Sequence, residues 1–365
     1  MKAVINRKNF LNALNIGGAM SSKAKGLSIL ELAKITFKDN YATVSSFDGE
    51  VAITKRVSIE EHSEDIVFCV HPKDLSSILK TISDAIVIMD VADNICTITH
   101  SKGSMSLPYN KADEFPTPHL SKDVITHTIV ANTLYYYLKE AVSFISNNTL
   151  YPQLMGVNIM FENDNWGVAA TDMSVLYYNK QEYQNNTECC SAIISEKSIN
   201  AILQMIADVD IVKIMFGSNT VMFKTSDSMV VATKSEHNYP NFKIIIPKNY
   251  EDKIEIKKSN LLESVNRTML MTDKSTNLLK FEFRKHSFEL QGEDIMNVKK
   301  SKEVCDCKCF GNGMSIAFRG DYFLKMLNVI DSENVTLRLI APDRPAIFVD
   351  EANVDKVLLQ MPCMI

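Results

Sequence analysis

The sequence predicts an α+β protein built from three similar domains in tandem, each with two helices and antiparallel strands. The main observation is a twelve-residue helical pattern that begins at His71, Ser195 and Arg319, so that the copies lie a constant 124 positions apart. In each copy apolar residues recur at i, i+3, i+4 and i+7, which is the buried stripe of an amphipathic helix. Solenoid units run about 20–50 residues. The longer spacing therefore predicts one whole domain repeated three times.

The apolar positions of the three copies coincide one by one. They are Leu75, Ile199 and Phe323, then Ile78, Ile202 and Met326, then Leu79, Leu203 and Leu327, then Ile82, Ile206 and Ile330. Two further landmarks keep the same spacing. Asp48 of Ser46-Phe47-Asp48-Gly49 corresponds to Asp172 of Ala170-Thr171-Asp172-Met173, and the Pro116 of Glu-Phe-Pro corresponds to the Pro240 of Asn-Tyr-Pro.

Each third opens with a strand-like stretch and then a further helix, which precedes the repeated twelve-residue helix in the sequence. These helices are expected over Asn9–Asn15, Asn132–Ile145 and Ser259–Met271. Alternating apolar and polar residues between the helices predict half-buried strands. The strand runs are Tyr41–Ile53, Ile86–Ile98, Val157–Phe161, Ile211–Lys224 and Val335–Ile340. The predicted domains are residues 1–122, 123–248 and 249–365, with boundaries in the polar segments Ser121–Asp123 and Pro247–Tyr250. Each has the usual size of a single domain.

Composition indicates an ordinary globular chain, with 46% hydrophobic and 23% charged residues. No apolar run approaches the roughly 18 residues of a membrane span, and the opening Met1–Phe10 is too polar for a signal peptide. We therefore expect a cytoplasmic protein. Eight irregularly spaced cysteines fit a reducing compartment better than a disulfide scaffold.

A formal net charge of −5 gives no general attraction to nucleic acid. Basic residues nevertheless gather on the helices, off the apolar stripe, and Lys73 and Lys197 occupy the same repeat position. The full set is Lys8, Lys73, Lys80, Lys139, Lys197, Lys258, Arg267, Arg319 and Lys325. If the helices face one way, they form a basic surface on an acidic protein. The alternative is that these side chains are only the solvated faces of amphipathic helices.

No metal site, cofactor site or catalytic motif is expected. Cys305, Cys307 and Cys309 would lie on one face of a strand, too spread for one tetrahedral zinc ion. Cys189 and Cys190 are read as strand residues. The sequence has no phosphate-binding G-x-x-x-x-G-K-[ST] pattern, no G-x-S-x-G and no H-E-x-x-H.

Several short motifs, in order and at the right spacing, resemble the bacterial DNA polymerase III beta subunit, the sliding clamp family. They are Ala170-Thr171-Asp172, Tyr239-Pro240-Asn241-Phe242 before Ile246-Pro247, Ala317–Leu324, and the terminal Gln360-Met361-Pro362-Cys363-Met364-Ile365. The resemblance covers the whole chain. It implies half of a six-domain ring, a homodimer that encircles duplex DNA and tethers the replicative polymerase without catalysing a reaction. Two alternatives are a scaffold of the same fold that no longer encircles DNA, and an enzyme of unknown class.

By this resemblance the DNA-contacting residues are Lys23, Lys25, Lys73, Asn148, Tyr151 and Lys197. Contacts of this kind should go to phosphates, because groove readout of base sequence would hinder sliding. The ring interface is placed at Met105 of the first domain and at Met269 and Leu270 of the third; packing within the domain cores is the alternative for these three.

The resemblance also implies a pocket for short peptide motifs of DNA polymerase III, the clamp loader and other clamp-binding proteins. Its residues are Leu154, Thr171, Met173, Leu176, Pro240, Ile244, Ile245, Pro345, Met361, Pro362 and Met364. Met side chains can repack around several ligands. Ordinary core packing is the alternative for Leu154 or Leu176 taken singly. The chain has Met173-Ser174-Val175 where the family commonly has Gly-His-Arg, which predicts a more apolar, less basic pocket.

Overall fold

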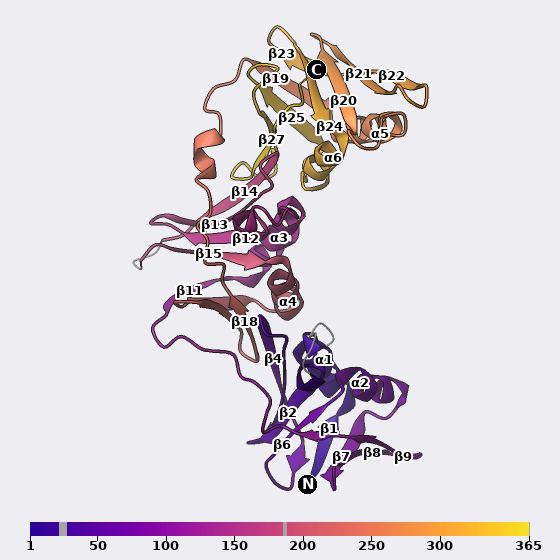
Figure 1. Cartoon of the computed structure of the whole chain (residues 1–365), viewed down its shortest axis with the longest axis vertical. Coiled ribbons are helices and arrows are strands. Elements are labelled where there is room, and N and C mark those ends of the chain that lie inside the picture. Colours follow the sequence, from indigo (N-terminus) through magenta and orange to yellow (C-terminus); the bar gives the residue numbers. More distant parts are fainter. Residues whose placement is uncertain (22–27, 185–187, 365) are drawn as a thin grey trace. The chain divides into compact units, whose positions relative to one another are not determined.

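A computed structural model describes residues 1–21, 28–184 and 188–364, and the chain divides into two compact units. The first unit comprises Met1–Tyr136 and Ile194–Glu236, and the second comprises Tyr137–Ile193 and His237–Ile365. Figure 1 labels the α-helices and most of the strands along the chain.

The α-helices of the described part form three consecutive pairs, one pair in each third of the chain. They are α1 (Arg7–Gly17), α2 (Pro72–Thr81), α3 (Ala131–Ala141), α4 (Glu196–Ile206), α5 (Lys258–Met269) and α6 (Gly320–Asn328). The first helix of each pair directly follows a strand, as predicted. The expected helix Asn132–Ile145 is shorter than predicted, because α3 ends at Ala141 and a 3-10 turn, η3 (Val142–Phe144), follows it.

The repeated apolar stripe is the buried face of α2, α4 and α6. Leu75, Ile199 and Phe323, which hold the first stripe position, have no exposed surface. At the other positions only Ile78 and Leu203 are half-buried rather than buried. The pattern therefore predicted the core-facing side of these helices correctly.

Two antiparallel sheets make up most of the first unit. The five-stranded sheet has the order β5 (Glu61–His62), β1 (Lys2–Asn6), β7 (Ile86–Ala92), β8 (Ile95–His100), β9 (Gly103–Pro108). The nine-stranded sheet has the order β10 (Asn110–Lys111), β6 (Ile66–Val70), β2 (Ala33–Lys38), β3 (Tyr41–Phe47), β4 (Val51–Ser58), β18 (Ser228–Thr233), β17 (Thr220–Lys224), β16 (Ile211–Phe216), β11 (Ile125–Val130). Pairing of β4 with β18 joins the first and central thirds in one sheet.

The second unit repeats this arrangement with the central and last thirds. Its nine-stranded sheet has the order β15 (Cys190–Ser195), β12 (Gly156–Phe161), β13 (Asn165–Thr171), β14 (Val175–Glu182), β27 (Val357–Gln360), β26 (Ala346–Val349), β25 (Asn334–Leu339), β19 (Asp252–Lys257), β23 (Lys308–Phe310). Its four-stranded sheet has the order β22 (Lys299–Asp306), β21 (Ser287–Asp294), β20 (Leu278–Phe283), β24 (Ser315–Arg319). Here β14 pairs with β27. The central third thus shares strands with both neighbours.

Three predicted strand runs are hairpins rather than single strands. The runs Tyr41–Ile53, Ile86–Ile98 and Ile211–Lys224 each contain two strands joined by a tight turn. In the second run Asp93 and Asn94 have φ of 51° and 62°. Two successive residues in the left-handed region form the turn that matches the twist of a two-residue hairpin. The polar turn residues interrupt the alternation only briefly, so the runs looked continuous.

In the first third, α1 and α2 lie side by side and pack on the sheets (Figure 1). Phe10 of α1 stacks on Phe37, and Phe37 stacks on Phe68, with ring centroids 6.1 Å apart in both pairs. A Cβ atom at Gly17 would lie 2.3 Å from the carbonyl oxygen of Val44. Only glycine therefore allows α1 to pack this closely on β3.

A buried ionic network connects α3 with the last third inside the second unit. Lys356 Nζ donates to the carbonyl oxygen of Val329 at 2.6 Å and lies 3.2 Å from Glu140 Oε1 and 3.3 Å from Asp350 Oδ2. The side chain of Lys356 is 2% exposed and that of Asp350 is fully buried. Tyr177 donates its hydroxyl to Glu140 Oε2 at 2.8 Å. This network fixes α3 against the strands that carry the C-terminal segment.

Candidate functional sites

An apolar cluster of the second unit lies where β14, β27 and the segment around Phe242 meet. Leu176, Phe242 and Leu359 are buried in it, and Tyr178 packs its ring against Phe242 with centroids 4.9 Å apart. Tyr239 packs on the same cluster. We call this cluster, together with the exposed side chains of Met173, Ile244, Ile245, Met361 and Met364, the tail site. It brings together segments that are more than 180 positions apart in the sequence.

The β13–β14 turn gives the tail site one of its edges. Asp172 Oδ1 accepts the backbone N–H groups of Ser174 and Val175 at 2.9 and 3.0 Å. Thr171 donates its hydroxyl to the carbonyl oxygen of Val175 at 2.5 Å and accepts the N–H of Met173 at 3.1 Å. Met173 has a φ of 79° and its side chain is exposed. The turn therefore holds an apolar side chain outward at some cost in backbone strain.

Two backbone hydrogen bonds hold the C-terminal tail. Met361 N–H donates to the carbonyl oxygen of Ser174, and Cys363 N–H donates to that of Ala317, both at 2.8 Å. The tail is thus tied to the β13–β14 turn on one side and to β24 on the other. Met364 is 97% exposed, so an apolar side chain next to the end of the chain is presented to solvent.

The remaining residues predicted for the pocket lie at its edges or in the core. Pro345 lies opposite Met361, because its neighbour Ala346 pairs with Gln360. Pro240 is exposed next to the cluster, and its carbonyl oxygen accepts the N–H of Phe242 at 2.8 Å. Leu154 is buried at the end of the 3-10 turn η4 (Pro152–Leu154). Pro362 is half-buried in the tail.

Sequence reasoning missed two side chains beside the tail, Arg319 and Tyr322. The guanidinium of Arg319 binds the carboxylate of Asp321 through Nε at 3.1 Å and Nη2 at 2.8 Å, and lies 5.0 Å from the ring centre of Tyr322. Burial, with a hydrogen bond to Asp172, raises the pKa of Tyr322 to about 12. A basic group therefore stands close to the tail even though the Thr-Asp motif lacks its usual arginine. The signal was Arg319 itself, at the start of the third helical repeat.

The basic residues of the helices divide into paired and unpaired side chains. Arg267 is paired with Glu303 at 2.8 Å, Arg319 with Asp321, and Lys258 donates to the carbonyl oxygen of Ile330. Lys197 is paired with two carboxylates, Asp48 at 2.7 Å and Glu50 at 3.6 Å.

Three lysines of the first third, Lys8, Lys73 and Lys80, are exposed on α1 and α2. Among residues 1–21, 28–184 and 188–364, no acidic group or other acceptor lies within ion-pair or hydrogen-bond distance of their ammonium groups. These three keep their full charge available to an external anion, whereas several other helix cations are already engaged within the protein.

Of the other residues predicted to contact DNA, Asn148 and Tyr151 lie in the loop before η4. Lys23 and Lys25 fall outside the described residues. Asn148 is exposed, and its Oδ1 accepts the N–H of Leu150 at 3.0 Å, which shapes the loop before η4. Tyr151 is half-buried and donates its N–H to the carbonyl oxygen of Asn148 at 3.0 Å.

The residues predicted for the ring interface occupy the ends of their sheets and helices. Met105 lies in β9, the last strand of the five-stranded sheet, and packs partly on its own core. Met269 ends α5, is half-buried and lies against Gly320. Leu270 follows it and is 70% exposed. Val304 is exposed on β22, which is the end strand of the four-stranded sheet.

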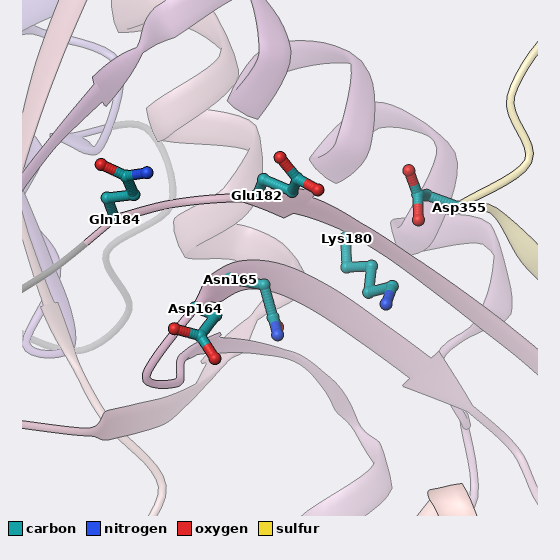
Figure 2. Close-up of a pocket in the computed structure, with 6 residues that line it drawn as sticks. All are labelled: Asp164, Asn165, Lys180, Glu182, Gln184 and Asp355. Atoms are coloured by element: carbon teal, nitrogen blue, oxygen red, sulfur yellow. The ribbon is translucent and has the colours of Figure 1, made fainter.

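A polar pocket of about 320 Å³ is lined by residues of the central third and by Asp355 of the last third, and its lining contains none of the predicted site residues. Figure 2 shows its lining side chains: Asp164, Asn165, Lys180, Glu182, Gln184 and Asp355. Within residues 1–21, 28–184 and 188–364, no group of three or more His, Cys, Asp or Glu side chains is arranged to hold a metal ion.

The cysteine run does not lie in a single strand, which corrects the sequence prediction. Cys305 belongs to β22 in the four-stranded sheet, whereas Cys309 belongs to β23 in the nine-stranded sheet. The chain crosses between the sheets at Cys307. Burial raises the pKa of Cys307 to about 11 and also raises the pKa of Cys309, so both thiols stay protonated at neutral pH. Of the other pair, only Cys190 is in a strand, and Cys189 precedes it.

Comparison with protein families matches the chain in three consecutive parts. Residues 1–120 match the DNA polymerase III beta subunit N-terminal domain, residues 129–241 its central domain, and residues 243–364 its C-terminal domain. The beta sliding clamp of Staphylococcus epidermidis RP62A is 24% identical, with 98% of both chains aligned. That of Streptococcus pneumoniae R6 is 23% identical over 98% of this chain and 97% of the relative.

Solved structures show the same fold. The sliding clamp of Pseudomonas aeruginosa bound to griselimycin has a TM-score of 0.95 at 18% identity, and the beta subunit of Streptococcus pyogenes polymerase has 0.94 at 19%, each with both chains fully covered. The fold is therefore the three-domain α+β clamp fold, as expected from the three repeats together with the family resemblance. No helix of the described part is long and apolar enough to cross a membrane. The chain belongs to the DNA polymerase III beta subunit family, and it is a DNA sliding clamp, a non-catalytic processivity factor of replication.

Proposed function

We propose that two copies of this chain join head to tail into a ring of six similar domains that encircles duplex DNA. The observation that carries the proposal is the match of three clamp domains within one chain, which makes six in a dimer. Two end strands support it, because β9 and β22 each lie at the end of a sheet and have one edge without a strand partner among the described residues. An unpaired edge is a template for strand addition. Exposed Leu270 and Val304 near the second edge supply the apolar contact that an interface needs.

DNA is held in this proposal by topology and by a few interchangeable phosphate contacts. Lys8, Lys73 and Lys80 supply point charges on flexible stems, which contact phosphates without reading sequence. A closed ring needs no strong contact, because it cannot leave the duplex sideways. The domain boundaries proposed for the ring are residues 1–122, 123–248 and 249–365.

We further propose that the tail site binds short peptide segments of DNA polymerase III, the clamp loader and other clamp-binding proteins in the cytoplasm. Its buried floor and exposed Met and Ile side chains suit a helical or extended peptide that inserts apolar anchors. The engaged Arg319 beside Tyr322 leaves a mainly apolar surface for recognition.

Encirclement is tested by threading the protein onto a linear duplex that is anchored to a bead at one end. After loading, the free end is capped with a bulky protein, and the beads are washed in high salt, which screens phosphate contacts. We expect the clamp to remain only when both ends are blocked, and a restriction cut between the blocks to release it. Equal loss from capped and open DNA would contradict encirclement and favour a scaffold of the same fold.

A further inference from the structure

The β3–β4 turn of the first third meets the start of α4 within the first unit. Lys197 Nζ lies 2.7 Å from Asp48 Oδ2 and 3.6 Å from Glu50 Oε2. Ser195, which caps α4, donates its hydroxyl to Glu50 Oε1 at 2.6 Å. The lysine and serine come from the central third and both carboxylates from the first third, so this cluster ties the two together. We call these four residues the clasp.

The Asp48 carboxylate of the clasp is buried and held in place, whereas the side chains of Glu50 and Lys197 are 42% and 31% exposed. The Asp48 side chain is fully buried, and its Oδ1 accepts the N–H groups of Glu50 and Val51 at 3.0 and 2.9 Å. Ser195 holds Glu50 in place. The Lys197 side chain is 31% exposed and ends in a flexible stem. Burial alone would lower the pKa of Lys197, but the hydrogen bond to Asp48 and the nearby acidic charges outweigh it and raise that pKa.

In the first third, the repeat position that corresponds to Lys197 is occupied by Lys73. Lys73 lies 124 residues before Lys197, is exposed on α2, and has no acceptor in range among the described residues. The pair therefore offers an internal comparison. Lys73 is available to an external phosphate. Lys197 instead lies between the carboxylates of Asp48 and Glu50, and these three ionised side chains together carry a net charge of about −1.

We propose that Asp48 and Glu50 mask Lys197, so that a DNA phosphate reaches this lysine only by displacing two carboxylates of the first third. The proposal rests on the proposed encirclement of DNA. Binding by a masked lysine gains little, because each phosphate contact replaces an ion pair already present. Asp48 and Glu50 then set how strongly the central third holds DNA, and a contact there loosens the tie between the first and central thirds.

The test compares the salt dependence of DNA affinity for single and combined variants of the full chain. Removing one phosphate-binding cation makes the slope of log affinity against log salt shallower by about 0.9. Lys73→Ala is the matched control for Lys197→Ala. The masking residues are changed by Asp48→Asn with Glu50→Gln, because both amides keep an oxygen that can accept the backbone and Ser195 hydrogen bonds. Short duplex DNA labelled with a fluorophore is the probe.

We expect Lys73→Ala to make the slope shallower by about 0.9 per protomer, and Lys197→Ala to leave it unchanged in the native background. In the Asp48→Asn, Glu50→Gln background, affinity should rise, and Lys197→Ala should then reduce the slope by about the same amount as Lys73→Ala. An equal effect of both lysines in the native background overturns masking, as does no effect of Lys197→Ala in the amide background. If Lys73→Ala has no effect either, the proposed DNA surface itself is wrong.

Discussion

Lys356 illustrates how a single buried charge can hold a domain junction together. Its ammonium group has three carboxylates within 3.6 Å and a backbone carbonyl, in a place that is almost closed to solvent. Such a network is weak evidence for high stability, because burying the charges costs nearly as much as their attraction returns. Removing one partner is different, since it leaves the other charges buried and uncompensated.

We predict that Lys356→Ala destabilises the second unit by about 3–5 kcal/mol. The physical reason is that Asp350, fully buried, and Glu140 lose their shared cation. Urea unfolding followed by circular dichroism measures the change. Lys257→Ala is the control, because its pair with Glu333 at 3.6 Å is exposed and should be worth at most about 1 kcal/mol. Similar midpoints for the two variants would contradict the role given to the network.

The pH dependence of stability should carry the signature of Asp350. Burial alone would raise the pKa of Asp350, but the N–H of Asp331, the charge of Lys356 and other hydrogen bonds outweigh it and lower that pKa below 3.8. A carboxyl group with a lowered folded pKa stabilises the protein above its unfolded value and loses this contribution as pH falls through the folded value. We therefore predict that Asp350→Asn is less stable than the native chain at pH 7. The difference should shrink below pH 3.8 in acid-dependent denaturation curves, and a constant difference would refute the assignment.

The sequence predicted which residues are basic and exposed, but not which of them are free. Lys73 and Lys197 looked equivalent, because they share a repeat position and lie off the apolar stripe. The partners of Lys197 are about 150 positions away in another third of the chain. Local pattern carries no information about such a contact. The same limit explains why Arg319 and Tyr322 were not expected beside the tail.

At the scale of single elements, the repeated β-turn shows what the 124-residue spacing preserves. Asp48 and Asp172 accept the same pair of backbone N–H groups, two and three residues further on. The residue after each aspartate has a positive φ, 97° at Gly49 and 79° at Met173. Glycine adopts this conformation freely, whereas methionine does not. The sequence aligned Asp48-Gly49 with Asp172-Met173 as landmarks of the repeat, but it did not predict that both segments form the same turn with a positive φ at Met173.

We predict that Met173→Gly weakens peptide binding at the tail site without destabilising the protein. The variant loses an exposed apolar side chain and relieves the left-handed strain. Met173→Ala is the control, because it removes the same side-chain atoms beyond Cβ and keeps the Cβ itself. The glycine variant should be more stable than the alanine variant by about 1 kcal/mol in urea denaturation. Peptide binding is followed by fluorescence anisotropy, and native affinity in both variants would exclude Met173 from the site.

The tail should act as a binding element rather than as a structural strand. We predict that deleting Met361–Ile365 abolishes binding of clamp-binding peptides and of polymerase while the dimer remains. The hydrogen bonds of Met361 and Cys363 hold the tail in position, but Met364 is exposed and contributes little to the fold. The loss should be a few kcal/mol of binding free energy, as for other buried anchors. A truncated protein that unfolds or becomes monomeric would show that the tail is structural.

For the whole molecule, the repeat predicted the number and kind of domains, and the family match confirmed the fold. It did not predict how the sheets are shared. Pairing of β4 with β18 and of β14 with β27 makes the central third part of two nine-stranded sheets. Side-chain alternation within a strand reports which face is buried, but not which distant strand forms its neighbour. Within each unit, a shared sheet therefore joins strands from two different thirds of the chain.

Ring closure also belongs to the scale of the whole molecule, and Leu270 offers a sharp test of it. Leu270 is 70% exposed at the end of α5, so Leu270→Asp should leave the folded monomer intact. If β9 of one copy and the α5–β22 side of another form the interface, a buried aspartate there is uncompensated and breaks the dimer. Leu150→Asp is the matched control, because Leu150 is 79% exposed in the loop before η4. Sedimentation at micromolar concentration should give a monomer for the first variant and a dimer for the second. A dimer in both cases would place the interface elsewhere. A monomer in the native chain would remove the physical basis for encirclement, since three domains alone cannot close a six-domain ring.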